Sequence, residues 1–276
     1  MIKFENTEVV GWEHAIRGMR NPMNSWEKSD SGRGGYYIRR EYGEPCSWHR
    51  IDNPDEDDLN DDCVEWVDDE SSYKIGLNDL KLMMNLRNAG TDHRKFMRMI
   101  TVYVDIIAPL YWWKEFKTYR AGRKFGDPEP DIIDPELLEM DIETNSCSTM
   151  HKIHEKEFTL EDFSHEHLSC IDVGGRVGSP YQMLKNTIRM LNECRELYLQ
   201  TKDKEYWWQM IQLLPTSYNQ KRTVMLNYEV LANIYKSRRN HKLDEWVDFC
   251  KWIESLPYSE LICGPEFLRK EFNVSR

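Results

Sequence analysis

Two stretches of the chain combine residue types that could bind and transform a ligand. The first, Ala108–Arg120 with the sequence APLYWWKEFKTYR, interleaves aromatic rings with lysine, glutamate and arginine side chains. The second, Asn145–Lys152 with the sequence NSCSTMHK, is compact and polar. Aromatic rings can stack on a planar ligand, and a few local arginines can hold a small anion. The same rings also suit a core, so their spacing alone leaves both uses open.

A third stretch, further along the chain, has polar residues at helical spacing. Steps of four, three and four residues, which return to one face of a helix, connect Asn227, Leu231, Ile234 and Arg238. The two polar ends of this line are roughly 16 Å apart, at ~1.5 Å of rise per residue. That length suits a nucleotide-sized ligand, and it is equally compatible with an ordinary helix.

A cysteine nucleophile and a metal site are the weaker alternatives. Cys147 lies in the polar string, but no neighbouring residue is identified as its base, so it is only a minor candidate. The seven cysteines form no Cys-x-x-Cys pair, which argues against a zinc cage and a full disulfide set. The histidines of HKIHEKEFTLEDFSHEH match no common zinc spacing, so we predict no metal site.

Composition and charge bound the class of protein. The chain has 276 residues, 40% of them hydrophobic, which is enough for one large core or two small ones. Its net charge of -11 argues against binding long nucleic acid, because that needs a continuous basic surface. The first residues lack the pattern of a secretion signal, and no run reaches the ~20 apolar residues of a membrane helix. We therefore expect a folded cytoplasmic protein.

Periodicity predicts the elements that would position these residues. Leucine and methionine recur at helical spacing in Gly76–Gly90, which ends at glycine and predicts a helix. The run ITVYVDII, Ile100–Ile107, alternates and predicts a strand near the middle of a sheet. The proline that follows favours a helix over Pro109–Arg120. The last third of the chain, including Arg222–Leu256, reads as helical.

Two acidic segments interrupt this pattern. The sequence SGRGGYYIRR predicts a turn leading into a short strand, and the acid-rich run Asn53–Glu70 after it predicts an exposed loop. A second segment, acidic and broken by prolines, follows Arg120. We interpret the two as insertions near residues 27–72 and 121–144.

Three segments, in order along the chain, resemble the flavin-dependent thymidylate synthases, the ThyX family. DHRKFMRMITVYVDIIAPLYWWKEFKTYR resembles that family's histidine-bearing link, its central strand and its helix ending in an R-H-R triplet. NSCSTMHK is similar to the rest of the signature, N-E-x-S-x-R. LLPTSYNQKRTVMLNYEVLANIYKSRRNHKLDEW is similar to the family's C-terminal pattern of Leu-Pro, asparagine, leucine and arginine. Together they cover under half of the chain.

The resemblance implies an α/β (α+β) fold with a central sheet and long C-terminal helices, in a single domain over residues 1–276. It also implies a homotetramer that holds FAD at subunit boundaries, beside a site for deoxyuridylate (dUMP). In that family a reduced flavin passes the methylene group of methylenetetrahydrofolate to C5 of dUMP, with NADPH as reductant and without a cysteine nucleophile.

The resemblance also implies roles for individual residues. It implies flavin contacts at six positions, which are His93, Tyr119, Arg120, Asn145, Asn227 and Asn233. It implies substrate contacts for Glu115, which replaces a glutamine of the family, and for Ser148 and Arg238. The last two residues are the candidates for the catalytic centre.

Some positions depart from the family's residues, and these are Thr118, Ser146, Met150, Ile211 and Glu229. Four of them replace arginines, so charge-assisted contacts to phosphate or flavin are lost. A carboxylate at Glu115 would also repel a phosphate unless it is paired, with Lys114 or Lys117 as the nearest cations. These departures weigh against ordinary dUMP methylation more than against the fold.

We therefore predict an FAD-dependent enzyme that transfers a one-carbon unit from folate to C5 of a pyrimidine deoxynucleotide, dUMP or dCMP. The product could be methylated or hydroxymethylated. The main alternative is a non-catalytic relative that binds a nucleotide, or a protein partner through its acidic insertions. A globular protein with incidental similarity is the remaining alternative.

Overall fold

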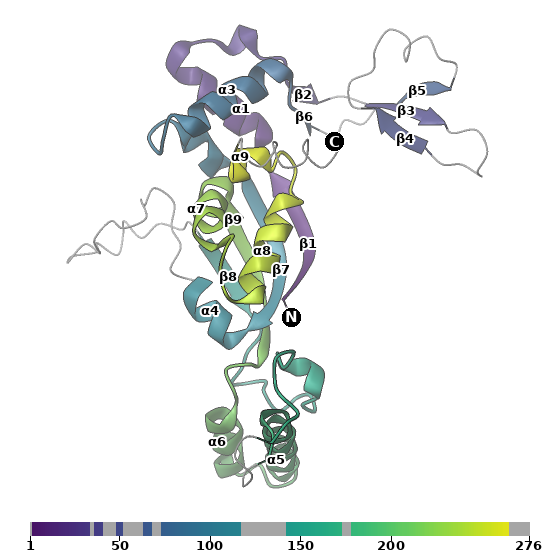
Figure 1. Cartoon of the computed structure of the whole chain (residues 1–276), viewed down its shortest axis with the longest axis vertical. Helices are drawn as coiled ribbons and strands as arrows, with labels where there is room; N and C mark the ends of the chain where they lie inside the picture. The colour runs from purple at the N-terminus through teal and green to yellow at the C-terminus, as the bar shows by residue number, and fades with distance from the viewer. Residues whose placement is uncertain are drawn as a thin grey trace, which may run out of the picture. The chain divides into compact units, whose positions relative to one another are not determined.

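The computed structural model describes residues 2–33, 36–40, 48–51, 63–67, 73–116, 142–172 and 178–264 (Figure 1). The chain forms two compact units. One, called here the sheet unit, consists of Met1–Val10 and Thr101–Arg276. The other, called the inserted unit, is Gly11–Ile100 and therefore interrupts the sheet unit in the sequence.

The sheet unit is built on a four-stranded antiparallel sheet with the strand order β1-β7-β9-β8. Its strands are β1 (Lys3–Val10), β7 (Thr101–Pro109), β8 (Ile142–Ser146) and β9 (Asn219–Asn227). The strand predicted at Ile100–Ile107 is confirmed as β7, between β1 and β9. Val102, Val104 and Ile106 are buried and alternate with more exposed residues, so one face of β7 belongs to the core.

The helix predicted from Arg222 onward is wrong at its start, because the chain continues β9 as far as Asn227. Gln220, Arg222, Val224 and Leu226 are buried at every second position, which is the period of a strand. Leucine and methionine fit either period, and no glycine or proline separates the strand from the following helix. Pairing with β7 along the whole of β9 makes this segment a strand and not a helix.

Helices cover the face of the sheet that carries Val102 and Val224. They are α4 (Leu110–Phe116), α7 (Tyr228–Arg238), α8 (Asp244–Glu254) and α9 (Glu260–Cys263), and Figure 1 shows α7 and α8 in front of the strands. Phe4 of β1 shares this face, and its ring stacks on Trp252 of α8 at a centroid distance of 5.0 Å. The opposite face, called here the polar face, carries Asp105, Lys221 and Thr223 together with the apolar Ile107 and Met225.

The aromatic stretch after β7 packs into the core. Pro109 completes β7 and α4 begins one residue later than predicted, while the part of the predicted helix beyond Phe116 lies outside the described residues. The rings of Trp112 and Phe116 stack at 4.8 Å, and Trp112 also contacts Trp246 of α8 at 4.8 Å. These side chains are fully buried, so this part of the stretch is core.

A helical pair belongs to the same unit. Its members are α5 (Pro180–Thr201), which Ser179 caps, and α6 (Lys204–Leu213), which Asp203 caps. The buried cluster between this pair and the segment before it includes Phe158, Leu184, Leu191 and Met210. These helices confirm the helical reading of this part of the chain.

The inserted unit consists of short elements. Its helices are α1 (Trp12–Arg20), α3 (Leu77–Asn88) and the 3-10 turns η1 (Asn21–Met23), η2 (Trp26–Lys28) and η3 (Arg94–Met99). Its strands are β2 (Gly32–Arg33), β3 (Tyr36–Arg40), β4 (Trp48–Ile51), β5 (Val64–Val67) and β6 (Tyr73–Lys74), which form the sheets β2-β6 and β4-β3-β5. The helix predicted at Gly76–Gly90 is confirmed as α3, and Gly90 follows with a positive φ of 110°.

The predicted insertions are described only in part. Within the acidic run, Val64–Val67 forms β5 and pairs with β3, so this part is a strand and not the predicted loop. Residues 52–62 and 68–72, and residues 117–141 of the second insertion, lie outside the described residues. Ile142–Thr144, at the end of the second insertion, already belongs to β8.

A buried ion pair organises the inserted unit. Asp79 of α3 has no exposed surface, and one of its carboxylate oxygens, Oδ1, accepts a 2.6 Å bond from Nε of Arg20 at the end of α1. The other, Oδ2, accepts bonds from the Ser29 and Ser31 hydroxyls at 2.7 and 2.6 Å. Burial alone would raise the pKa of Asp79, but these bonds and the Arg20 charge outweigh it and lower the pKa.

Gly11 marks a place where the chain needs glycine. Its φ of 94° is in the left-handed region, and a Cβ atom there would lie 2.0 Å from the backbone oxygen of Met99. Any other residue would therefore separate the start of α1 from the end of η3. These two elements pack against each other within the inserted unit.

On the exposed face of the sheet, Asp105 is the centre of a polar network. Its carboxylate accepts bonds from the Thr223 hydroxyl at 2.6 Å and the Asn6 amide at 2.9 Å, and it pairs with Lys221 at 3.2 Å. Because the bond from Thr223, then those from Asn6 and Lys221, favour the charged form, the pKa of Asp105 falls to about 2.

We expect Asp105 to make stability depend on pH in acid. A lowered pKa in the folded state means that the carboxylate stabilises the protein above its unfolded pKa of about 3.9, and that this contribution disappears as pH falls towards 2. The melting temperature of Asp105→Asn should therefore be below that of the wild type at pH 5, and the gap should narrow between pH 4 and 2. A difference in melting temperature that is constant over this pH range would contradict the stabilising role of the Asp105 carboxylate in the network.

Candidate functional site

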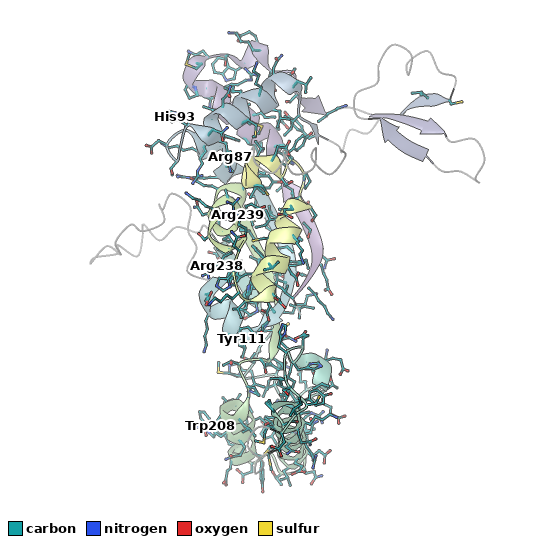
Figure 2. The ribbon with its side chains drawn as sticks, in the orientation of Figure 1. Arg87, His93, Tyr111, Trp208, Arg238 and Arg239 are labelled. Atoms are coloured by element: carbon teal, nitrogen blue, oxygen red, sulfur yellow. The ribbon has the colours of Figure 1, made fainter. Side chains whose placement is uncertain are left out.

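Two residues of the candidate site, Glu115 and Arg238, come together in the structure although they are far apart in sequence. Arg238, labelled in Figure 2, ends α7, and Glu115 lies in α4. Their side chains form an ion pair of 3.1 Å between Nη2 and Oε2. The cations expected beside Glu115 are Lys114 and Lys117; the structure adds Arg238 as a partner, and Lys117 lies outside the described residues. The repulsion expected between Glu115 and an anionic ligand is thereby reduced.

An indole ring fixes this pair in place. The Arg238 guanidinium lies over Trp246 of α8 at 4.8 Å from the ring centroid, and Trp246 Nε1 donates to Glu115 Oε2 at 3.2 Å. Arginine stacked on an aromatic ring keeps its planar donors directed within that plane. The fractional exposures of the Arg238 and Glu115 side chains are 21% and 44%, so both remain reachable from solvent.

A part-buried contact next to this pair also holds α4 against α8. The Tyr111 hydroxyl donates to Glu245 Oε1, and burial, followed by that carboxylate, raises the pKa of Tyr111. His167 bonds Asp244 at 2.8 Å and links the start of α8 to the segment before α5. Sequence reasoning missed these contacts, because partners on different helices leave no local pattern.

Asn227 is the N-cap of α7. Its side-chain oxygen accepts a 3.1 Å bond from the backbone nitrogen of Val230, and the residue is 9% exposed. The predicted line from Asn227 to Arg238 exists, but Leu231 and Ile234 between them are fully buried. Only its two ends could meet a ligand.

The remaining candidate on α7 is partly accessible, and one departure from the family lies in the core. Asn233 is half-buried, and its backbone oxygen accepts a bond from the Ser237 hydroxyl at 3.0 Å. Glu229, which stands in place of a flavin-side arginine in the resemblance, has no exposed surface. Glu229 is therefore not accessible to a ligand at the surface.

Asn145 and Ser148 lie elsewhere. Asn145 is exposed on β8, and through its partner Thr223 it shares the polar face of the sheet, opposite the helices that carry Arg238. Ser148 follows β8, and its hydroxyl accepts bonds from the backbone nitrogens of Met150 and His151 at 3.3 and 2.9 Å. Cys147 between them is exposed. One copy of the chain thus presents its candidate residues on two sides of the sheet.

The structure does not place three of the predicted flavin residues relative to Arg238 and Glu115. Tyr119 and Arg120 lie outside the described residues. His93 belongs to the inserted unit, where it is exposed directly before η3, and its backbone nitrogen donates to Gly90 at 3.1 Å. Figure 2 labels His93 together with Arg87 of the same unit.

Substituting Asn227 should separate its capping role from a ligand role. Asn227→Ala removes the cap and should cost about 1 kcal/mol in the free energy of unfolding. Asn227→Ser keeps an N-cap oxygen and should restore most of that loss in a denaturant titration. If the amide also contacts flavin, Asn227→Ser should still bind FAD roughly tenfold more weakly than the wild type. Equal FAD affinity in the two proteins would leave Asn227 as a cap alone.

The described residues form neither a metal site nor a membrane-spanning helix. Among the described residues, no group of three or more His, Cys, Asp or Glu side chains is arranged to hold a metal ion. Within the same part of the chain, no helix has the length and apolar character needed to cross a membrane.

Comparison with solved structures shows the fold. No family model matches the chain, and no curated protein matches it in sequence. The structure of thymidylate synthase X (ThyX) from Helicobacter pylori with FAD and dUMP is similar, with a TM-score of 0.54 and 13% identity over 96% of this chain and 98% of that one. Another structure of that enzyme, also complexed with FAD and dUMP, gives a TM-score of 0.53 at 13% identity, over 95% and 99% of the two chains.

Proposed function

We propose that this chain is a divergent flavin-dependent enzyme that modifies C5 of a pyrimidine deoxynucleotide. The chain has a ThyX-like fold, which the similarity over nearly the whole of both chains establishes. The observation that carries the proposal is the pairing of Glu115 with Arg238 over Trp246, because it joins in space two residues that the sequence resemblance had selected independently.

The residues present suit an FAD molecule. Asn233 on α7 is accessible in part, Asn227 lies at the start of the same helix, and Asn145 and His93 are exposed. Amide and imidazole groups can donate to the carbonyl and ring-nitrogen acceptors of a flavin. When bound, the flavin would supply the redox and one-carbon transfer chemistry, as it does in the ThyX family. Asn227 and Asn233 would bind and orient it, and the contacts of Asn145 and His93 are proposed from the resemblance alone.

The pair formed by Arg238 and Glu115 suits a pyrimidine base. The planar guanidinium can donate to a carbonyl oxygen of the base, while the Glu115 carboxylate can accept from a ring N–H or an exocyclic amino group. Such a site can hold uracil or cytosine, so the acceptor is dUMP or dCMP. Ser148, an exposed residue, is the second proposed substrate contact.

Further parts of the proposal follow the family. Methylenetetrahydrofolate would donate the one-carbon unit, NADPH would reduce the flavin, and the enzyme would act in the cytoplasm as a homotetramer. The placement of Asn145 on the polar face, opposite the helices that carry Arg238, supports a site completed by residues of another copy.

A non-catalytic nucleotide-binding relative is the second candidate. Met150 and Ile211 stand where the family has arginines, and Met150 is 52% exposed, so a charge is missing at an accessible position. Such a relative would bind FAD or a nucleotide without consuming NADPH.

The test uses the full chain purified in the presence of FAD. An absorption spectrum would show bound flavin, and titration with dUMP and dCMP would show whether the flavin band changes. A change with either nucleotide, followed by NADPH oxidation in the presence of that nucleotide, supports the enzyme. Bound flavin without NADPH oxidation favours the second candidate, and a protein that binds neither FAD nor nucleotide contradicts both.

A further inference from the structure

A buried arginine in the sheet has not been accounted for by the candidate site. Arg222 of β9 is only 9% exposed and lies on the helix-covered face. Its guanidinium stacks over Trp113 of α4 at 4.3 Å from the ring centroid. The Trp113 ring is itself fixed, since its Nε1 donates to the backbone oxygens of Ala108 and Gln220 at 3.0 and 3.1 Å.

The polar partner of Arg222 is an amide. Its Nε and Nη2 groups donate to Gln220 Oε1 at 3.0 and 2.8 Å. Within the described part of the chain, no carboxylate lies within ion-pair distance of Arg222. A buried cation without a counter-charge is costly, and burial lowers the pKa of Arg222.

One end of the guanidinium is still open to a ligand. In the same part of the chain, Nη1 of Arg222 makes no hydrogen bond. The described side-chain atoms that are both fully buried and without a hydrogen-bond partner are Trp112 Nε1 and His154 Nδ1. Since Nη1 is not one of them, it keeps contact with solvent. The donor is therefore preorganised by stacking and is not wholly shielded from solvent.

Arg222 is also connected to the polar string after β8. It pairs across the sheet with Ser146, so both residues belong to the same face. Its partner Gln220 donates through Nε2 to the backbone oxygen of Cys147 at 2.6 Å. Gln220 thus connects the Arg222 guanidinium to the backbone of the segment that leads to the exposed Ser148.

We propose that Arg222 is an anion anchor that binds the phosphate group of a ligand at the end of β8. The phosphate would supply the missing counter-charge, and a planar guanidinium held on Trp113 suits its oxygens. This inference rests on the proposed function for the identity of the ligand, which is the nucleotide monophosphate. The pyrophosphate of FAD has the same chemistry and is distinguished by experiment.

The experiment compares ligands that differ only in phosphate. Wild-type protein should bind dUMP more tightly than deoxyuridine. Arg222→Met should lower the affinity for dUMP by about 10- to 100-fold and leave the affinity for deoxyuridine unchanged. Lys221→Met is the matched control, because it removes a charge from the adjacent residue on the opposite face. Its dUMP affinity should equal that of the wild type.

Other outcomes identify the source of the phosphate or reject the anchor. A loss of affinity for FAD but not for riboflavin in Arg222→Met would assign the anchor to the flavin pyrophosphate. If the protein binds neither FAD nor dUMP, stabilisation of the wild type but not of Arg222→Met by inorganic pyrophosphate would keep the anchor and reject the proposed function. Should Arg222→Met fail to fold, Arg222→Lys keeps the charge without the planar fork and replaces it in each comparison.

The anchor is overturned by either of two results. One is a folded Arg222→Met protein that binds dUMP, FAD and pyrophosphate as the wild type does. The other is a wild-type protein that prefers neither dUMP over deoxyuridine nor FAD over riboflavin, and whose melting temperature does not respond to pyrophosphate. Both would mean that stacking on Trp113 is the whole role of Arg222.

Discussion

Asp79→Ala is expected to lower the free energy of unfolding of the inserted unit by about 3–5 kcal/mol. The substitution leaves the guanidinium of Arg20 buried without its carboxylate, and it also removes the acceptor shared by Ser29 and Ser31. A buried charge that loses its partner keeps its desolvation cost, which makes this loss larger than that of a surface pair. A urea titration followed by circular dichroism would measure it.

Two further variants make the interpretation of Asp79 specific. Glu27→Ala removes an acidic residue from the exposed turn η2 and should change stability by less than about 0.5 kcal/mol. Replacing both partners, in Arg20→Met with Asp79→Leu, removes the uncompensated charge and should be milder than Asp79→Ala alone. A loss below about 1 kcal/mol for Asp79→Ala would show that the pair does not organise this unit.

Arg238→Ala should reduce nucleotide-dependent turnover by roughly 100- to 1,000-fold. The variant removes the planar donor that Trp246 and Glu115 hold in place, and it leaves the Glu115 carboxylate facing the ligand. Stability should change little, because a pair this accessible contributes at most about 1 kcal/mol. Steady-state kinetics and a melting curve would together separate the two roles.

The neighbouring residue offers the control. Arg239 follows α7 and is exposed, and Figure 2 labels it separately from Arg238. Arg239→Ala removes the same charge and should keep turnover within a few-fold of the wild type. Arg238→Lys should recover little, because an ammonium group lacks the planar fork. Full activity in Arg238→Ala would place the substrate site elsewhere.

The sequence predicted those elements whose pattern is local. Alternation across Ile100–Ile107 gave β7, and the leucines and methionines before Gly90 gave α3, because each pattern fits one period better than the other. The strand β9 was missed, since Val224 and Leu226 fit both periods and pairing with β7 is a tertiary effect. Strand pairing over the whole length of β9 leaves no trace in the sequence of either strand.

The site could be predicted as a set of residues but not as an arrangement. Resemblance selected Glu115 and Arg238 separately, whereas their contact depends on how α4 and α7 cover the sheet. Arg222 was assigned to a helix, and on a helix it would be an ordinary charged residue. Its role as a candidate anchor follows only from the register of β9, which directs its side chain towards Trp113.

The position of the inserted unit in the sequence has a consequence for how the chain folds. Strand β7 pairs with β1 although Gly11–Ile100 separates the two strands in the sequence. It also pairs with β9, from which the residues between Pro109 and Asn219 separate it. Sheets that depend on such distant pairings form slowly, because loop closure must precede their contacts.

On the ribosome the two units would therefore mature at different times. The inserted unit is complete once Ile100 has emerged, whereas β7 has no neighbour on its β9 side until Asn227 has been synthesised. During that interval one edge of the apolar strand β7 is unpaired in the nascent chain. Chaperone dependence of folding should accordingly be concentrated in the sheet unit.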